Sequence, residues 1–252
     1  MRGLALAVLL CGCSVQQAPD DTRSAVGPRQ MTVAPVTLKA SDGLTVYGRY
    51  YRTTRPKALI LLFHQAGSSM GEYATIAPKL AAAGYSALAI DQRSGGGLFG
   101  PNRTAAQLKR DPGYAAAQRD MQAALDWGAM QNLPIVIWGS SYSAALAFPL
   151  AAENADRVKA VLAFSPGEYL DDKTAVVRAA KKLTMPVFLA VADGGAEAAA
   201  AKPIAAALAG DSIFYSPAHG VHGSSTLIEA KNPQGTAANW QAVEAFLRRA
   251  VG

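Results

Sequence analysis

Short apolar runs follow one another along most of the chain, with longer amphipathic segments between them. The runs are typical of strands covered on both faces of a sheet, and they lie at residues 58–63, 86–90, 133–138, 158–164, 186–192 and 213–216. The segments between them space their apolar residues as helices do, and they lie at residues 72–84, 114–130, 142–147, 174–183 and 196–208. Because strands that alternate with helices form βαβ units, the pattern predicts a mostly parallel sheet.

Both ends of this pattern carry extra elements. Two β-rich segments, residues 33–39 and 44–51, are separated by a turn that ends in Asp42-Gly43, and Asp-Gly is a strong hairpin signal. A last helix is expected near the C-terminus, and Pro203 leaves open whether the helix at 196–208 is one piece or two. We therefore expect an antiparallel N-terminal hairpin and helices on both faces of the sheet. No large lid domain is expected, because the insert between residues 164 and 186 has room for only one short helix.

The first residues are typical of a secretion signal. Arg2 is followed by an apolar run that is too short to span a bilayer and suits a signal peptide. Residues 10–13, Leu-Cys-Gly-Cys, resemble the lipobox of bacterial lipoproteins, which implies that Cys13 is lipidated and becomes the mature N-terminus. An ordinary secretory signal cleaved nearby is the alternative. We expect a signal peptide at 1–12, a lipid-anchored tether at 13–30 and one domain at 31–252.

Ser14 after that cysteine resembles the outer-membrane form of the lipoprotein signal. The chain is thus expected to be a cell-envelope lipoprotein, anchored in the outer membrane by its lipid and facing the periplasm. The two cysteines, Cys11 and Cys13, both belong to this segment. The domain itself therefore has no possible internal disulfide, and its stability must come from packing.

Composition excludes several classes of function. The formal charge is +6, but the basic residues are scattered and form no recognisable nucleic-acid motif, so a nucleic-acid partner is not expected. A solvated surface with mild attraction to anionic headgroups is the better interpretation. Three dispersed histidines fall short of the spacing that metal ligands require, and neither a metal nor a cofactor is expected.

The candidate chemistry centres on residues 139–143, Gly-Ser-Ser-Tyr-Ser, which stand between a predicted strand and a predicted helix. A sharp strand-to-helix turn requires small residues two positions before and after its tip, where Ser141 stands. Ser143 is small enough for the second position, though less permissive than glycine. A serine held in this way points out of the sheet beside a helix N-terminus, where backbone amides can stabilise an oxyanion. Ser141 is therefore the predicted nucleophile.

From residue 58 to the C-terminus the chain resembles the α/β-hydrolase family, and within it the small dienelactone hydrolase-like enzymes and related esterases. The resemblance rests on the turns His64-Gln65-Ala66-Gly67 and residues 91–96, the serine turn, an acid after the strand at 186, and a His-Gly pair after the last strand. It implies an α/β-hydrolase fold in which the backbone amides of Gln65 and Tyr142 hold the oxyanion. The order serine, acid, histidine is also that of the family.

The base and the acid each have two candidates. His219 and His222 are both followed by glycine, and the family's placement of this pair favours His222 as general base. His64 precedes the serine and is expected to shape the oxyanion turn. Asp193 follows its strand directly and is favoured as the acid that orients the imidazole, with Glu197 as the alternative.

These residues predict a serine hydrolase that cleaves a small or moderately sized carboxylic ester by acyl-enzyme chemistry, with Ser141, Asp193 and His222 as the catalytic residues. A thioesterase or a peptidase of the same fold is the enzymatic alternative. A catalytically silent member that binds a ligand or partner at the cell envelope is the non-enzymatic one. The sequence identifies no protein partner.

Overall fold

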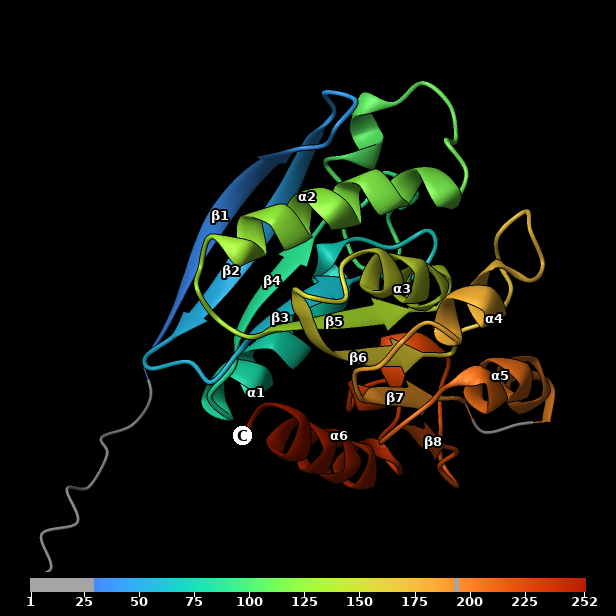
Figure 1. Ribbon diagram of the computed structural model, residues 1–252. Coiled ribbons are helices and arrows are strands. Elements are labelled where there is room, and N and C mark those ends of the chain that lie inside the picture. The colour runs from blue at the N-terminus through green and yellow to red at the C-terminus, as the bar shows by residue number, and fades with distance from the viewer. Residues whose placement is uncertain (1–29, 193–194) are drawn as a thin grey trace, which may run out of the picture.

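An eight-stranded sheet forms the centre of the computed structural model, which describes residues 30–192 and 195–252 (Figure 1). The strands are β1 (Met31–Lys39), β2 (Thr45–Thr53), β3 (Leu59–Phe63), β4 (Ser86–Ile90), β5 (Ile135–Ser140), β6 (Val158–Phe164), β7 (Val187–Ala190) and β8 (Ile213–Tyr215). The helices are α1 (Ile76–Ala82), α2 (Gln118–Ala129), α3 (Tyr142–Glu153), α4 (Ala175–Ala180), α5 (Gly195–Ala207) and α6 (Thr236–Val251). Four 3-10 turns complete the elements: η1 (Met70–Tyr73), η2 (Ala105–Gln107), η3 (Ala115–Ala117) and η4 (Gly223–Leu227). The predicted signal peptide, Cys13 and Asp193 lie outside the described residues.

The strand order confirms the predicted fold class. The sheet runs β1-β2-β4-β3-β5-β6-β7-β8, with β1, β2 and β4 antiparallel to one another in turn and the remaining neighbours parallel. The carboxyl ends of β3, β5, β6 and β7 therefore meet at one edge of the sheet, where α/β proteins place their ligand sites. We call the opposite end, where β1 and these parallel strands begin, the basal end.

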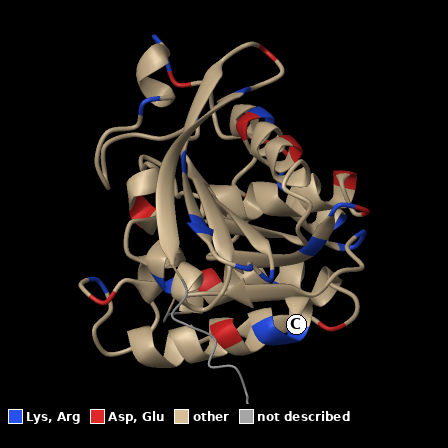
Figure 2. Cartoon of the chain, turned by 90° about the vertical axis from the view of Figure 1, so that its left-hand side faces the viewer, with Lys and Arg blue, Asp and Glu red and all other residues tan. Residues whose placement is uncertain are grey.

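Exposed cations gather at the basal end, which Figure 2 views from the side where the described chain begins. The exposed side chains are Arg52 at the end of β2, Lys159 at the start of β6, and Lys181 and Lys182 before β7. None of the four forms an ion pair with a carboxylate among residues 30–192 and 195–252. Within the same ranges, no helix is long and apolar enough to cross a membrane.

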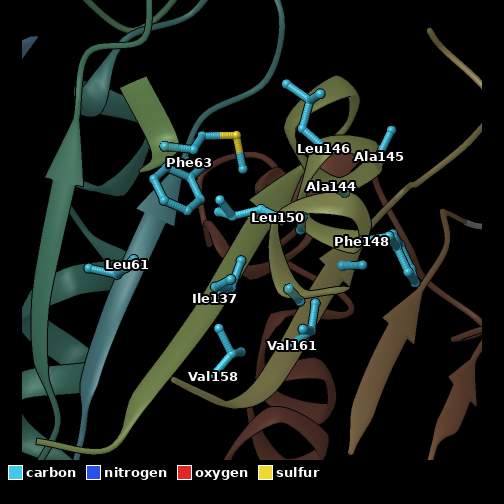
Figure 3. Close-up of a cluster of buried hydrophobic side chains, with 14 of the residues drawn as sticks. Leu61, Phe63, Ile137, Ala144, Ala145, Leu146, Phe148, Leu150, Val158 and Val161 are labelled. Atoms are coloured by element: carbon cyan, nitrogen blue, oxygen red, sulfur yellow. The ribbon is translucent and has the colours of Figure 1, made fainter. Parts of the chain in front are cut away.

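Side chains alternate between two apolar layers, one on each face of the sheet. In β5, Ile135 and Ile137 join the layer under α2 to α5, whereas Val136 and Trp138 join the layer over α1 and α6. Figure 3 shows Ile137 in the first layer, between β3 and α3. All the residues of β5 are buried, which explains why the run lacks the polar alternation of a half-exposed strand.

A strand and a helix approach each other closely at the turn from β5 into α3. A Cβ added at Gly139 would lie 2.5 Å from the Cα of Ala144 and 2.6 Å from its nitrogen. Both are backbone atoms, so the turn cannot adjust by moving a side chain. The prediction that a small residue is needed two positions before Ser141 has its physical reason here.

Two predicted helices are divided in the structure, and several strand ends differ from the predictions by a few residues. The segment expected as a helix at 114–130 forms η3 and then α2. The expected helix at 72–84 is divided into η1 and α1, because Ser69 caps η1 by accepting from Gly71 N at 3.2 Å and the chain turns again before residue 76. The helix at 195–207 continues through Pro203, which settles the choice that the sequence left open. The long segment after β4 contains η2 and is held by Arg93, whose guanidinium pairs with Asp42 and Asp120.

Replacing Gly139 by alanine should destabilise the fold, because the new Cβ would push β5 and α3 apart. The expected loss is roughly 1–3 kcal/mol of the free energy of unfolding, as for overpacked cores. Urea denaturation followed by circular dichroism would measure it. Gly97→Ala is the matched control, since a Cβ there meets nothing within 4 Å. Equal denaturation midpoints for the two variants would contradict the steric argument.

Candidate active site

Ser141 stands at the tip of the turn with a strained backbone. Its φ is 60° and its ψ is −120°, a conformation that residues other than glycine rarely adopt. The turn is held by Ser141 N, which donates to Phe164 O at 2.8 Å, and by Ala145 N, which donates to Ser141 O at 3.2 Å. Strain of this kind persists only where the surrounding structure imposes it. The side chain is thereby placed at the start of α3.

Ser143 stabilises the turn with its hydroxyl group. Its Oγ accepts from Ser140 N at 2.9 Å and donates to Phe63 O at 2.7 Å. These bonds tie the turn to the end of β3, next to the oxyanion turn. Serine at this position is therefore an anchor as well as a small residue.

The His222 imidazole bonds directly to a carboxylate. Its Nδ1 lies 2.5 Å from Oε1 of Glu197, and the other carboxylate oxygen, Oε2, accepts from Ala192 N at 2.9 Å. Burial opposes the charged form of Glu197, but hydrogen bonds from His222, Ser165 and Ala192 outweigh it and lower the pKa of Glu197 to about 2. The hydrogen bond with Glu197 in turn raises the pKa of His222 above its usual value, against the effect of burial. The geometry fixes one tautomer, with the Nδ1 proton toward Glu197.

The loop that carries His222 is bonded to the serine turn. Gly223 N donates to Ser165 Oγ at 2.9 Å, and Ser224 N donates to Ser140 Oγ at 2.9 Å. Gly223 has a φ of +65°, and a Cβ there would lie 2.4 Å from Ser140 Oγ. Two features therefore favour glycine at position 223: the positive φ of the backbone and the close approach of Ser140 Oγ.

The competing candidates have different surroundings. His219 is exposed, and its carbonyl accepts from Asn232 Nδ2 at 3.1 Å. Asp193 lies outside the described residues, so its predicted role stays a prediction. Among the Asp and Glu residues that the structure describes, Glu197 is the one that forms an ion pair with His222.

His64 is fully buried and shapes the oxyanion turn. Its Nε2 accepts from Gln92 N at 2.8 Å, so its Nδ1 carries the proton and donates to Gln65 O at 2.8 Å. Burial lowers the pKa of His64 to about 4, and the ring stays neutral. Its two nitrogens are occupied by backbone groups, which agrees with the structural role expected for this histidine.

The amide that the family resemblance implies for the oxyanion, the Gln65 N–H, already has a hydrogen-bond partner in the structure. Gln65 N donates to Oε2 of the buried Glu72 at 2.8 Å, so this N–H is not available for an oxyanion. Gln65 O accepts from His64 Nδ1 and, at 3.3 Å, from Ser68 N. Since the C=O and N–H of a trans peptide point in opposite directions, the Ala66 N–H faces away from His64 and Ser68. We find no hydrogen-bond partner for it within the described ranges.

Aromatic side chains border the site. Tyr142 is buried and stacks on the half-exposed Tyr114, with ring centroids 4.7 Å apart. Burial raises the pKa of Tyr169, and a hydrogen bond with the Ser141 side chain opposes that rise. A hollow of about 330 Å³ is lined by Tyr114 and Tyr169, and another of about 390 Å³ is lined by Ala66 and Tyr114. Both small cavities thus border Tyr114.

Sequence reasoning missed Glu72 and Ala66. Glu72 begins a predicted helix, where an acidic residue is ordinary because of the helix dipole, so nothing in the sequence marked it as buried. Ala66 carries no reactive side chain, and only the orientation of its peptide distinguishes it. In the part of the chain that the structure describes, no group of His, Cys, Asp or Glu is arranged to hold a metal ion.

Comparisons with known proteins show the family and the fold of the chain. The family model Hydrolase_4, described as serine aminopeptidase S33, matches residues 54–206. The match includes Ser141 and Glu197, and His222 follows it. No curated protein matches the sequence.

Solved structures share the fold at low sequence identity. A dienelactone hydrolase from Anabaena variabilis is 19% identical, with a TM-score of 0.70 over 88% of this chain and 100% of its own. An esterase from Pyrococcus furiosus is 17% identical, with a TM-score of 0.67 over 88% of this chain and 94% of its own. Brefeldin A esterase, a bacterial homologue of human hormone-sensitive lipase, is 17% identical, with a TM-score of 0.65 over 93% of this chain and 79% of its own.

Replacing Glu197 by glutamine should lower the pKa of His222, because the hydrogen bond that His222 donates to Glu197 is the largest cause of its rise. The measurement is an NMR titration of the imidazole signals. These signals are simple to assign, because the chain has only three histidines. Asp193→Asn is the matched control and should leave the titration of His222 unchanged. A shift in the control and none in Glu197→Gln would instead make Asp193 the partner of His222.

Proposed function

The chain belongs to the Hydrolase_4 family of α/β-hydrolases, and we propose that it is a serine hydrolase that cleaves a carboxylic ester through an acyl-enzyme. The observation that carries the proposal is the His222–Glu197 pair, whose loop is bonded through Ser224 and Ser140 to the strained turn of Ser141. A nucleophile, a base and a group that orients the base are the three parts that such catalysis needs.

In the proposed reaction one proton passes from Ser141 to His222, and His222 then passes it to the leaving alcohol. Ser141 Oγ attacks the ester carbonyl while its proton passes to His222 Nε2, and Glu197 stabilises the resulting imidazolium. The C–O bond to the alcohol then breaks, and the alcohol leaves with the proton from His222. Water repeats the sequence on the acyl-enzyme, releasing the acid and restoring Ser141.

Two backbone amides hold the oxyanion in this scheme. Tyr142 N is at the N-terminus of α3, where it has no partner within the helix, and Ala66 N–H is the free amide of the oxyanion turn. Ala66 takes the role that the family resemblance implied for Gln65, because the Gln65 amide is bound to Glu72. Preorganised amides of this kind contribute about 10²–10³-fold each to turnover.

The surroundings of the site favour a small ester. The cavities beside Tyr114 have volumes of about 330 and 390 Å³, at the lower end of the range for small-molecule pockets. Between β6 and β7 the structure has one helix, the six-residue α4, so no large lid covers the serine. A peptidase is the second candidate, since the family model is described as a serine aminopeptidase.

A fluorophosphonate should label wild-type protein at Ser141, and Ser141→Ala should abolish the labelling. Turnover of p-nitrophenyl esters should fall on the order of 10⁴-fold or more in Ser141→Ala and His222→Ala. His219→Ala is the matched control and should keep wild-type turnover. Faster hydrolysis of aminoacyl p-nitroanilides than of any ester would favour the peptidase. Absence of labelling in folded protein at pH 8 would refute the serine mechanism.

We further propose that Cys13 carries a lipid and that the basal end lies on the anionic surface of the cell-envelope membrane. The described chain begins at Gln30, beside the first residue of β1, at the same end as the exposed cations Lys159, Lys181 and Lys182. Basic residues at a membrane surface contribute about 1 kcal/mol each. Because the site is at the opposite edge of the sheet, it faces away from the membrane in this orientation.

This orientation predicts electrostatic binding that does not need the lipid. The full chain carrying Cys13→Ser should sediment with vesicles of phosphatidylglycerol at low salt and not with vesicles of phosphatidylcholine. Lys181→Glu with Lys182→Glu should weaken binding by roughly tenfold or more. The control pair, Lys109→Glu with Arg110→Glu at the other end, should bind like the parent. An equal loss of vesicle binding in both double variants would show that binding depends on net charge alone, and it would contradict the proposed orientation.

A further inference from the structure

A carboxylate lies buried beneath the catalytic groups. Glu72 is 1% exposed, although it stands in the short turn η1. Its Oε2 accepts from Gln65 N at 2.8 Å, and its Oε1 accepts from Ser140 Oγ at 2.7 Å. Burial of an ionisable group at this depth is costly unless its charge has a use.

The contacts of Glu72 join the three segments that build the site. Gln65 belongs to the oxyanion turn, and Ser140 precedes the nucleophile. Ser140 Oγ, which donates to Glu72, also accepts from Ser224 N of the histidine loop at 2.9 Å. One side chain therefore sets the relative positions of oxyanion turn, nucleophile and base.

The electrostatic surroundings of Glu72 are unusual. Among the described residues no Lys or Arg forms an ion pair with it, and the positive charge that acts on it is that of protonated His222. The other titratable groups that feel its charge are Tyr73 and Tyr142, both buried and with pKa values raised well above the usual range. Around His222, the carboxylates are Glu197 from α5 and Glu72 from η1. Glu72 thus gains a cationic neighbour only when His222 takes up a proton.

We propose that Glu72 is a positioning residue that aligns the oxyanion turn with the nucleophile and stabilises the imidazolium that His222 becomes during the reaction. The proposal rests on the function proposed above. An interaction that is stronger with the imidazolium than with the neutral ring favours the transition state over the resting enzyme, which is the condition for accelerating the chemical step.

The proposal has a defined pH dependence. Burial raises the pKa of Glu72 to about 7, and the hydrogen bonds from Ser140 and Gln65 oppose that rise. Above this pH the carboxylate is charged and helps to raise the pKa of His222. As the pH falls through about 7, Glu72 takes up a proton and this contribution is lost.

The substitution Glu72→Gln removes the charge of this side chain and keeps its volume nearly constant. We expect the NMR titration of His222 to shift to lower pH, and the acid limb of kcat/KM to shift in the same direction. Loss of alignment should also lower kcat by about 10- to 100-fold. Glu72→Asp keeps the charge but is too short to reach both Gln65 and Ser140. It should lower kcat with a smaller shift of the titration, and it replaces the glutamine variant if that one fails to fold.

Asp91→Asn is the matched control, because Asp91 is another fully buried carboxylate of this region and accepts from Met70 N and Arg103 N. It should leave the titration of His222 unchanged. A His222 titration that is the same in wild type and Glu72→Gln, or an equal shift in Asp91→Asn, would overturn the proposal. Because this readout needs no turnover, it is separate from the labelling of Ser141, whose failure would refute the serine mechanism instead.

Discussion

The close contact between β5 and α3 is the constraint on which the rest of the structure depends. A strand and a helix meet where no Cβ fits at Gly139, and the turn between them forces Ser141 into a backbone conformation that serine rarely adopts. Neighbouring segments compensate for this strain. Ser143 bonds to the end of β3, and Ser140 accepts an amide of the histidine loop. The turn positions Ser141, the nucleophile in our proposal, and is bonded to the end of β3 and to the loop that carries His222.

Two carboxylates in contrasting environments act on one histidine. Glu197 is partly exposed, accepts hydrogen bonds from His222 and Ala192, and has a depressed pKa, so it is charged at neutral pH. Glu72 is buried and has a raised pKa, so its charge is conditional. The first carboxylate fixes the tautomer of the ring. In our proposal Glu72 interacts more strongly with the ring of His222 when that ring is protonated.

Predictions from the sequence succeeded where the evidence was local. The apolar runs, the Asp-Gly hairpin and the small residues of the serine turn are each visible within a few positions. They were enough to predict a mostly parallel sheet with an N-terminal hairpin, and the resemblance to a known family supplied the α/β-hydrolase fold. The oxyanion amide and Glu72 depend on contacts between residues far apart in the chain, such as Ser140 and Glu72, which are 68 positions apart. Hydrogen bonds between residues so far apart in the chain produce no periodic pattern in the sequence. The contact between Glu197 and His222 likewise joins positions 25 residues apart, and residue spacing alone does not predict it.

The bond between Ser224 N and Ser140 Oγ spans 84 positions of sequence, and it has a consequence for the order of assembly. Contacts of such long range require a large loop to close, and they form after the local ones during folding. A chain that emerges from its N-terminus first contains Ser141 long before it contains His222. The proposed site can therefore be completed only after the C-terminal segment has docked, so a partly synthesised chain has the serine turn without the histidine loop.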